Sequence, residues 1–148
     1  MPTYKHILVP VDESPISYAA VENALSLAKE IHASVTVMSV IAVDPFIGVD
    51  FYKVAPAVTE YFMKAEENAL LRLKEIESLF SRDEISVNTK VIHGVSAAEG
   101  IINIADEVSA DLIIMGSHGR TGLKKVVLGS VAQTVLTQSP IPVLIIKS

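Results

Sequence analysis

The chain contains no cysteine, and none of its apolar runs is long. Without cysteine, a disulfide-held scaffold, a thiolate zinc site and thiol catalysis are excluded. No apolar run approaches the roughly 20 residues that a membrane-spanning helix needs. The first residues lead directly into a strand-like run rather than into a signal peptide. We therefore expect a soluble, cytoplasmic protein that does not enter a membrane.

Positive charge is scarce as well. The formal net charge is −5, which argues against a general nucleic-acid binder, because such proteins neutralise phosphates with lysine and arginine. All 17 acidic residues, but only eight of the 12 basic ones, lie within residues 1–111. The other four basic residues are Arg120, Lys124, Lys125 and Lys147. This cationic segment indicates either a site for a small anion or only a solvated face.

The 148 residues are half apolar and one-fifth charged. This balance is typical of a chain that buries a core of its own rather than of a disordered tail. We expect one domain over residues 1–148, held together without a metal or a disulfide.

Apolar periodicity predicts that strands and helices alternate along the chain. Strands are predicted at 5–11, 34–43, 85–92, 111–115 and 142–147, and helices at 15–31, 57–80, 97–108 and from 130 onward. This alternation implies an α/β fold with an open parallel sheet and helices on both faces, because the crossovers are right-handed and cover the sheet. Ser14 is a candidate N-cap before Pro15, and Ser96 with Glu99 forms a capping box. The segment 44–56 is irregular.

Ligands of open parallel sheets bind beyond the carboxyl ends of the strands, where the strand order reverses. The first predicted strand ends in Pro10, Val11 and Asp12, and the fourth leads into a glycine-rich loop over 116–122. If these two strands are neighbours, the Asp12 carboxylate and the glycine loop face each other across one crevice.

A phosphate site is predicted where this loop leads into the last helix. Gly129 and Ser130 place backbone N–H groups and a hydroxyl at a helix N-terminus, which attracts anions. Arg120, Lys124 and Lys125 add positive charge nearby. The alternative is that the glycines only form turns. The coincidence of a helix start, a cationic segment and an opposing carboxylate favours phosphate.

The spacing Gly116-x2-Gly119-x9-Gly129-Ser130, with Asp12 closing the first strand, resembles the ATP-binding branch of the universal stress protein family. The resemblance covers the whole chain and implies five strands in the order 3-2-1-4-5. It implies an ATP site, with or without Mg²⁺, and leaves AMP and cyclic AMP open. The residues implied are Pro10, Val11 and Asp12 at the nucleoside, Val40 at adenine, Met115, Gly116, His118, Gly119 and Arg120 at ribose and phosphates, and Gly129, Ser130 and Val131 at phosphate.

A homodimer is expected through the last strand, 142–147. In the order 3-2-1-4-5 this strand is a sheet edge with four consecutive aliphatic residues, and an edge of this kind recruits another strand. A two-fold partner would close it, and the family resemblance implies the same arrangement. The alternative is that the segment 44–56 covers this edge. The segment holds three of the eight aromatic residues and could separately form a lid over the crevice, a partner surface or a loop folded on its own aromatics.

The function expected is that of a nucleotide-dependent stress-response or signalling module. The alternatives are a slow ATPase or self-phosphorylating enzyme that uses the same site, and an interaction module whose pocket stays empty. The chain has no P-loop and no hydrolase nucleophile elbow. His6, His32 and His93 lie in separate elements without ligand spacing. No catalytic residue and no metal site are therefore predicted, and the protein partner is not indicated.

Overall fold

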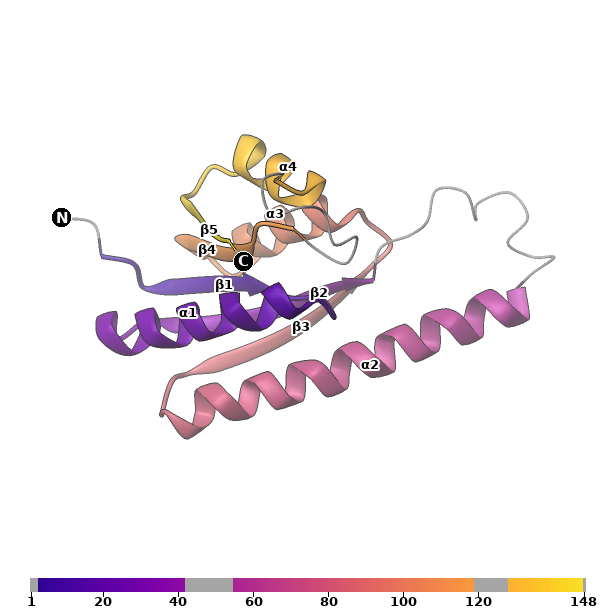
Figure 1. Cartoon of the computed structure of the whole chain (residues 1–148), viewed down its shortest axis with the longest axis horizontal. Coiled ribbons are helices and arrows are strands. Elements are labelled where there is room, and N and C mark those ends of the chain that lie inside the picture. Colours follow the sequence, from indigo (N-terminus) through magenta and orange to yellow (C-terminus); the bar gives the residue numbers. More distant parts are fainter. Residues whose placement is uncertain (1–2, 42–54, 119–127, 148) are drawn as a thin grey trace.

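A computed structural model of the chain shows a twisted parallel sheet between two layers of helices (Figure 1). The structure describes residues 3–41, 55–118 and 128–147, and for residues 55–59 it describes only the helical backbone. The strands are β1 (His6–Pro10), β2 (Ser34–Ile41), β3 (Val87–His93), β4 (Leu112–Gly116) and β5 (Val143–Ile146). The helices are α1 (Pro15–Ile31), α2 (Ala55–Arg82), α3 (Ala97–Glu107) and α4 (Ser130–Gln138).

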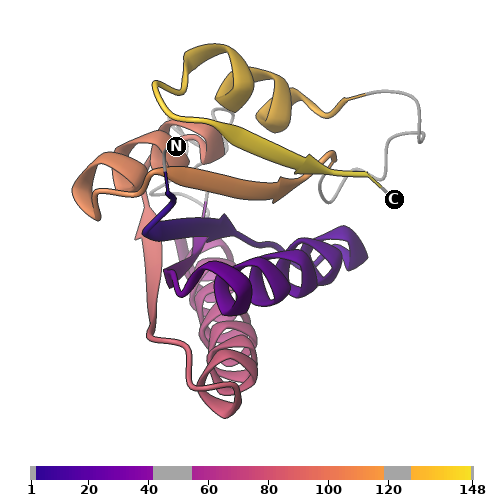
Figure 2. The same cartoon turned by 90° about the vertical axis from the view of Figure 1, so that its left-hand side faces the viewer.

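The strand order is β3-β2-β1-β4-β5, and every neighbouring pair is parallel. This confirms the predicted fold class and strand order. From β1 the chain adds β2 and β3 on one side of the sheet and then β4 and β5 on the other side. The topological switch point therefore lies between β1 and β4. Figure 2 shows β5 at the edge of the sheet, beside β4 and close to α4.

The pairing between β1 and β4 is short. It joins Ile7 to Leu112 and Leu8 to Ile113, although β1 continues to Pro10 and β4 to Gly116. The carboxyl ends of the two central strands are therefore not paired with each other. This opens the sheet at the switch point.

Two apolar cores form on opposite faces of the sheet, because successive side chains of a strand point to opposite sides. Ile7 and Val9 of β1 pack with α1 and α2, together with the fully buried Phe80. Leu8 of β1 packs on the other face with residues of α3 and α4, including Val135. Burial on both faces explains why the central strands read as continuous apolar runs.

The two predicted caps behave differently. At α3 the hydroxyl of Ser96 accepts a hydrogen bond from the Glu99 N–H at 3.3 Å, as predicted. At α1 the backbone of Ser14 has the N-cap conformation, but its side chain makes no capping hydrogen bond. The Ser14 hydroxyl instead donates to the Asp12 carboxylate. Ser14 is therefore the N-cap residue as predicted, but the expected capping hydrogen bond is not formed because its side chain is turned toward Asp12.

Helix α2 begins earlier than predicted, at Ala55, so the last two residues of the segment 44–56 are helical. The rest of that segment, 44–54, and the predicted end of β2 at 42–43 lie outside the described residues. The first turns of α2 extend past the carboxyl ends of the strands (Figure 1). Within the described part of the chain, no helix is both long and apolar enough to cross a membrane.

Candidate functional site

A pocket of about 600 Å³ lies at the carboxyl ends of β1, β2 and β4. Its volume falls within the roughly 300–1,000 Å³ range of small-molecule sites. One wall comes from α2, and the opposite wall comes from the first residues of α3 and α4. The pocket therefore occupies the switch point at which the sequence predicted a site.

Ten of the 12 predicted site residues line this pocket. They are Pro10, Val11, Asp12, Val40, Met115, Gly116, His118, Gly129, Ser130 and Val131. The other two, Gly119 and Arg120, lie outside the described residues, as do Lys124 and Lys125. The fold thus brings together predicted residues that are up to 121 positions apart in the chain, between Pro10 and Val131.

The Asp12 carboxylate is held firmly at the start of α1. Its Oδ1 atom accepts hydrogen bonds from the Ser14 N–H at 2.8 Å, from the Ser14 hydroxyl, and from the Ser17 hydroxyl at 2.9 Å. No described residue donates to the Oδ2 atom. One oxygen therefore anchors the helix, which leaves the other oxygen able to accept a hydrogen bond from a ligand.

Helix α4 begins at the pocket with Gly129 as its N-cap residue. The Gly129 N–H donates to the Ser117 carbonyl at 2.7 Å. The N–H groups of Ser130 and Val131 have no backbone acceptor among the described residues, as expected for a first helical turn. Both residues line the pocket, so these donors form a site suited to an anion.

Both described glycines of the signature also have a packing reason to be glycine. A Cβ atom at Gly129 would lie 3.0 Å from the His118 Cα and 3.2 Å from the Ser117 carbonyl oxygen. A Cβ atom at Gly116 would lie 2.8 Å from the Cγ2 atom of the buried Ile16. The glycines therefore do not by themselves indicate a phosphate site, whereas the N–H groups at the pocket do.

The α2 wall of the pocket was missed by the sequence reasoning. It consists of Tyr61, Phe62, Lys64, Ala65, Asn68, Ala69 and Arg72. Lys64, Asn68 and Arg72 follow one another at intervals of four, so they lie in one row on the helix. This row is the signal that sequence reasoning had available, but it reads equally well as a solvated helix face.

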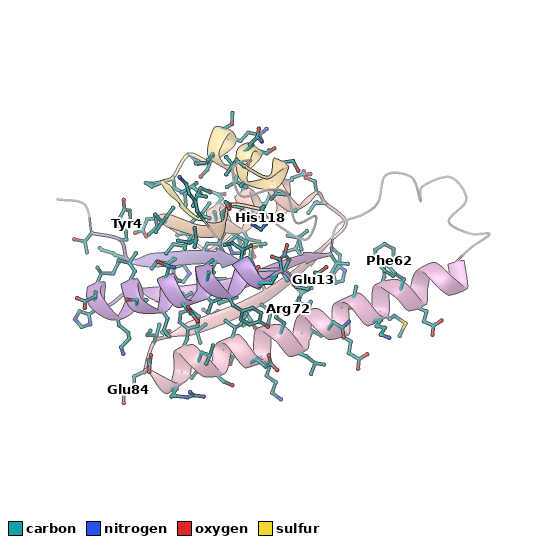
Figure 3. The ribbon with its side chains drawn as sticks, in the orientation of Figure 1. Tyr4, Glu13, Phe62, Arg72, Glu84 and His118 are labelled. Carbon is teal, nitrogen blue, oxygen red and sulfur yellow. The ribbon has the colours of Figure 1, made fainter. Side chains whose placement is uncertain are left out.

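Basic and acidic side chains of α2 differ in whether they line the pocket. Lys64 and Arg72 line the pocket, whereas none of the five described glutamates of this helix does. Figure 3 shows Phe62 closer to the start of α2 than Arg72, and Tyr4 and Glu84 at the other end of the molecule; Phe62, Arg72, Glu13 and His118 all line the pocket. The α2 wall therefore presents donors and positive charge to the cavity.

The remaining histidines lie apart from one another. His6 contacts the hydroxyls of Ser34 and Thr36, and burial lowers its pKa against the opposing effect of the Asp111 carboxylate. His93 pairs with Glu66 at 3.2 Å, and His32 follows α1 in a left-handed conformation. Over the described ranges, no group of three or more potential metal-ligating His, Cys, Asp or Glu side chains occurs.

Comparison with known proteins gives the family. The model of the universal stress protein family matches residues 3–147. The universal stress protein MJ0531 of Methanocaldococcus jannaschii is 35% identical over 144 residues, which cover 97% of this chain and 82% of that protein.

Solved structures agree with the sequence comparison. The structure of MJ0577, also from M. jannaschii, superposes with a TM-score of 0.84 at 30% identity over 99% of this chain and 98% of that one. A universal stress protein of Archaeoglobus fulgidus in complex with dAMP shares the fold, with a TM-score of 0.68 at 20% identity over 99% of this chain and 100% of that chain. The chain belongs to the universal stress protein family.

Proposed function

We propose that the pocket binds an adenine nucleotide, with ATP as the expected ligand, and that binding controls a stress-response or signalling role. The observation that carries the proposal is the pair of N–H groups at Ser130 and Val131, which open into the pocket opposite a fixed carboxylate at Asp12. Anions bind at helix N-termini, and carboxylates of nucleotide-binding α/β folds accept hydrogen bonds from ribose.

The order of the strands suggests how the nucleotide lies. The phosphates occupy the start of α4 beside β4, the ribose lies at Asp12 after β1, and the base lies at Val40 near the end of β2. This places the three parts of the ligand along β4, β1 and β2, which are neighbours in the sheet. Gly119 and Arg120 remain in the proposed phosphate site through the family resemblance.

Two further points support an adenine nucleotide. The cationic side chains of Lys64 and Arg72 offset the negative charge of Asp12 and Glu13 around the pocket, which favours entry of an anionic ligand. The A. fulgidus protein with the same fold holds dAMP, so this fold accommodates an adenine nucleotide. Neither point distinguishes ATP from AMP or cyclic AMP, so the experiment compares ligands with different numbers of phosphates.

The proposal includes a homodimer in the cytoplasm, joined through β5. The strand is paired on one side with β4, and Leu144 is 42% exposed on it. An apolar edge strand of this kind is closed when the same strand of a second copy pairs with it about a two-fold axis.

The variant Ser130→Pro tests the phosphate site directly. Proline removes one N–H from the first helical position, which tolerates proline well. The preceding Gly129 has φ −63° and ψ 156°, a conformation that a residue before proline can adopt. Ser130→Ala is the matched control, because it removes the hydroxyl and keeps the N–H.

Affinities for adenosine, AMP, ADP and ATP are measured by calorimetry on the wild type and both variants. Ser130→Pro is expected to weaken the phosphorylated ligands by roughly tenfold or more, in line with about 1.5–3 kcal/mol for a hydrogen bond to a charged group. Adenosine binding and the Ser130→Ala variant are expected to change little. If the proline variant binds ATP as the wild type does, the phosphates bind elsewhere. If the wild type binds none of the four ligands, the adenine nucleotide proposal is wrong.

A further inference from the structure

We propose that Asn68 of α2 reads the base of the bound nucleotide, and this inference rests on the proposed function. The Asn68 side-chain amide would accept a hydrogen bond from the 6-amino group of adenine and donate one to the neighbouring ring nitrogen. Asn68 is then a specificity-determining residue outside the glycine signature.

The position of Asn68 follows from the architecture. If phosphate lies at α4 and ribose at Asp12, the base points away from α4 toward β2. Helix α2 packs against β2 and β3, and Asn68 lines the pocket together with Val40 and Ile41 of β2. The base end of the pocket is therefore bounded by β2 on one side and by the Asn68 face of α2 on another.

Space and hydrogen-bonding capacity are both available at Asn68. Its neighbours on the pocket wall, Ala65 and Ala69, are small and leave room beside the amide. No described residue forms a hydrogen bond with the Asn68 side chain. The Asn68 side chain is exposed, so its amide can exchange hydrogen bonds with water for hydrogen bonds with a ligand that enters the pocket.

The chemistry of the amide suits adenine. Asparagine carries one acceptor oxygen and one donor NH₂ group, which match the donor and acceptor along the edge of adenine. The other members of the row, Lys64 and Arg72, only donate hydrogen bonds. They can approach ring nitrogens or phosphates, but they cannot accept a hydrogen bond from an amino group.

The test compares ATP with purine riboside triphosphate, which lacks the 6-amino group and keeps the ribose and all phosphates. Dissociation constants are measured for the wild type, for Asn68→Leu and for the control Asn103→Leu. Asn103 is exposed on α3 and does not line the pocket. Leucine is similar in size to asparagine and adds no charge, and thermal unfolding verifies that both variants are folded.

The wild type and Asn103→Leu are expected to bind ATP about tenfold or more tightly than the analogue. Asn68→Leu is expected to bind both ligands with similar affinity, because its affinity for ATP falls while its affinity for the analogue stays at the wild-type value. If Asn68→Leu keeps the wild-type preference for ATP, or if the wild type has no preference, the inference is wrong. Ser130→Pro distinguishes this failure from failure of the proposed function. If the phosphates bind at the start of α4, this variant loses ATP affinity whether or not Asn68 contacts the base.

Discussion

Ser17 and Asp12 are joined by two reciprocal hydrogen bonds, each 2.9 Å long. The Ser17 hydroxyl accepts from the Asp12 N–H and donates to the Asp12 Oδ1 atom. Ser17 is only 6% exposed, so this link lies inside the first turn of α1. It fixes the direction of the Asp12 carboxylate before any ligand arrives, which reduces the entropy that binding must supply.

Asp12→Asn is expected to keep the helix start and to weaken nucleoside binding. The amide oxygen can still accept from Ser14 and Ser17, whereas an NH₂ group replaces the second acceptor oxygen. Because the contact is made to ribose, adenosine, AMP and ATP should all lose affinity by about tenfold, in line with one charge-assisted hydrogen bond. Calorimetric titration with the three ligands measures this. A loss confined to ATP would contradict the ribose assignment and point to a role in binding Mg²⁺.

The stability of the fold is expected to fall in mild acid because of His6. Its Nδ1 atom lies 2.6 Å from the Ser34 hydroxyl and its Nε2 atom 2.7 Å from the Thr36 hydroxyl. Ser34 also donates to the Lys5 carbonyl at 3.3 Å, so Nδ1 carries the proton and Nε2 accepts from Thr36. A second proton on Nε2 would replace this acceptor with a donor facing a buried hydroxyl.

Burial lowers the pKa of His6 from its ordinary value of 6.5. The folded state therefore favours the neutral imidazole, so its contribution is fully present above pH 6.5 and is lost as the pH falls below that value. Urea unfolding at about pH 7.5 and about pH 5.5 should show this loss, and His6→Gln should reduce it. His32→Asn, which removes the exposed histidine after α1, should leave it unchanged. An equal reduction in both variants would show that the pH dependence has another source.

If the proposed dimer forms through β5, Leu144→Lys is expected to give a monomer that still binds nucleotide. Leu144 is 42% exposed on β5, so lysine can reach solvent without disturbing the core, and lysine on an edge strand opposes pairing. Leu71→Lys on α2, where leucine is 59% exposed, is the matched control. Sedimentation measures the mass of each variant. A wild-type monomer would contradict the dimer, and dissociation of the Leu71→Lys variant alone would place the interface on α2.

Turnover of ATP is expected to be far slower than the roughly 1–100 s⁻¹ of kinases. Backbone N–H groups at a helix start stabilise bound phosphate, whereas catalysis requires interactions gained only in the transition state. Asp12 already has one oxygen committed to α1. Release of inorganic phosphate, followed under single-turnover conditions, measures the rate. A rate within the kinase range would favour the enzymatic alternative over the binding module.

Much of the fold could be predicted because the sequence patterns that indicate its strands and helix starts are local. Aliphatic strands such as Leu112–Gly116 and the capping box at Ser96 are visible within a few residues. The strand order came from the family resemblance, and the structure confirms it. The N-cap position of Ser14 was predicted correctly, whereas the contact of its side chain with Asp12 was not, because that contact depends on how the chain turns before α1.

The site could be predicted only in part. Asp12, at the end of the first strand, follows from topology once the strands are known, whereas Val40 came from the family resemblance. The α2 wall depends on how far that helix extends past the sheet, and no local pattern gives this distance. Asn68 and Arg72 therefore resembled an ordinary solvated face until the structure placed them at the pocket.

The short pairing between β1 and β4 divides the sheet into a three-stranded part and a two-stranded part. The paired residues of β1 and β4 are Ile7–Leu112 and Leu8–Ile113, and the Asp111 N–H adds a hydrogen bond to the His6 carbonyl at one end of the pairing. Helix α1 bridges the junction by packing against β1, β4 and β5. A nucleotide with its ribose at β1 and its phosphates at β4 would act as a staple across this junction. Because β5 belongs to the smaller part, any change in the angle between the parts would reorient a partner attached to that strand. Occupancy of the pocket would then change the geometry of the proposed dimer, and slower hydrogen exchange along β4 and β5 would be its physical signature.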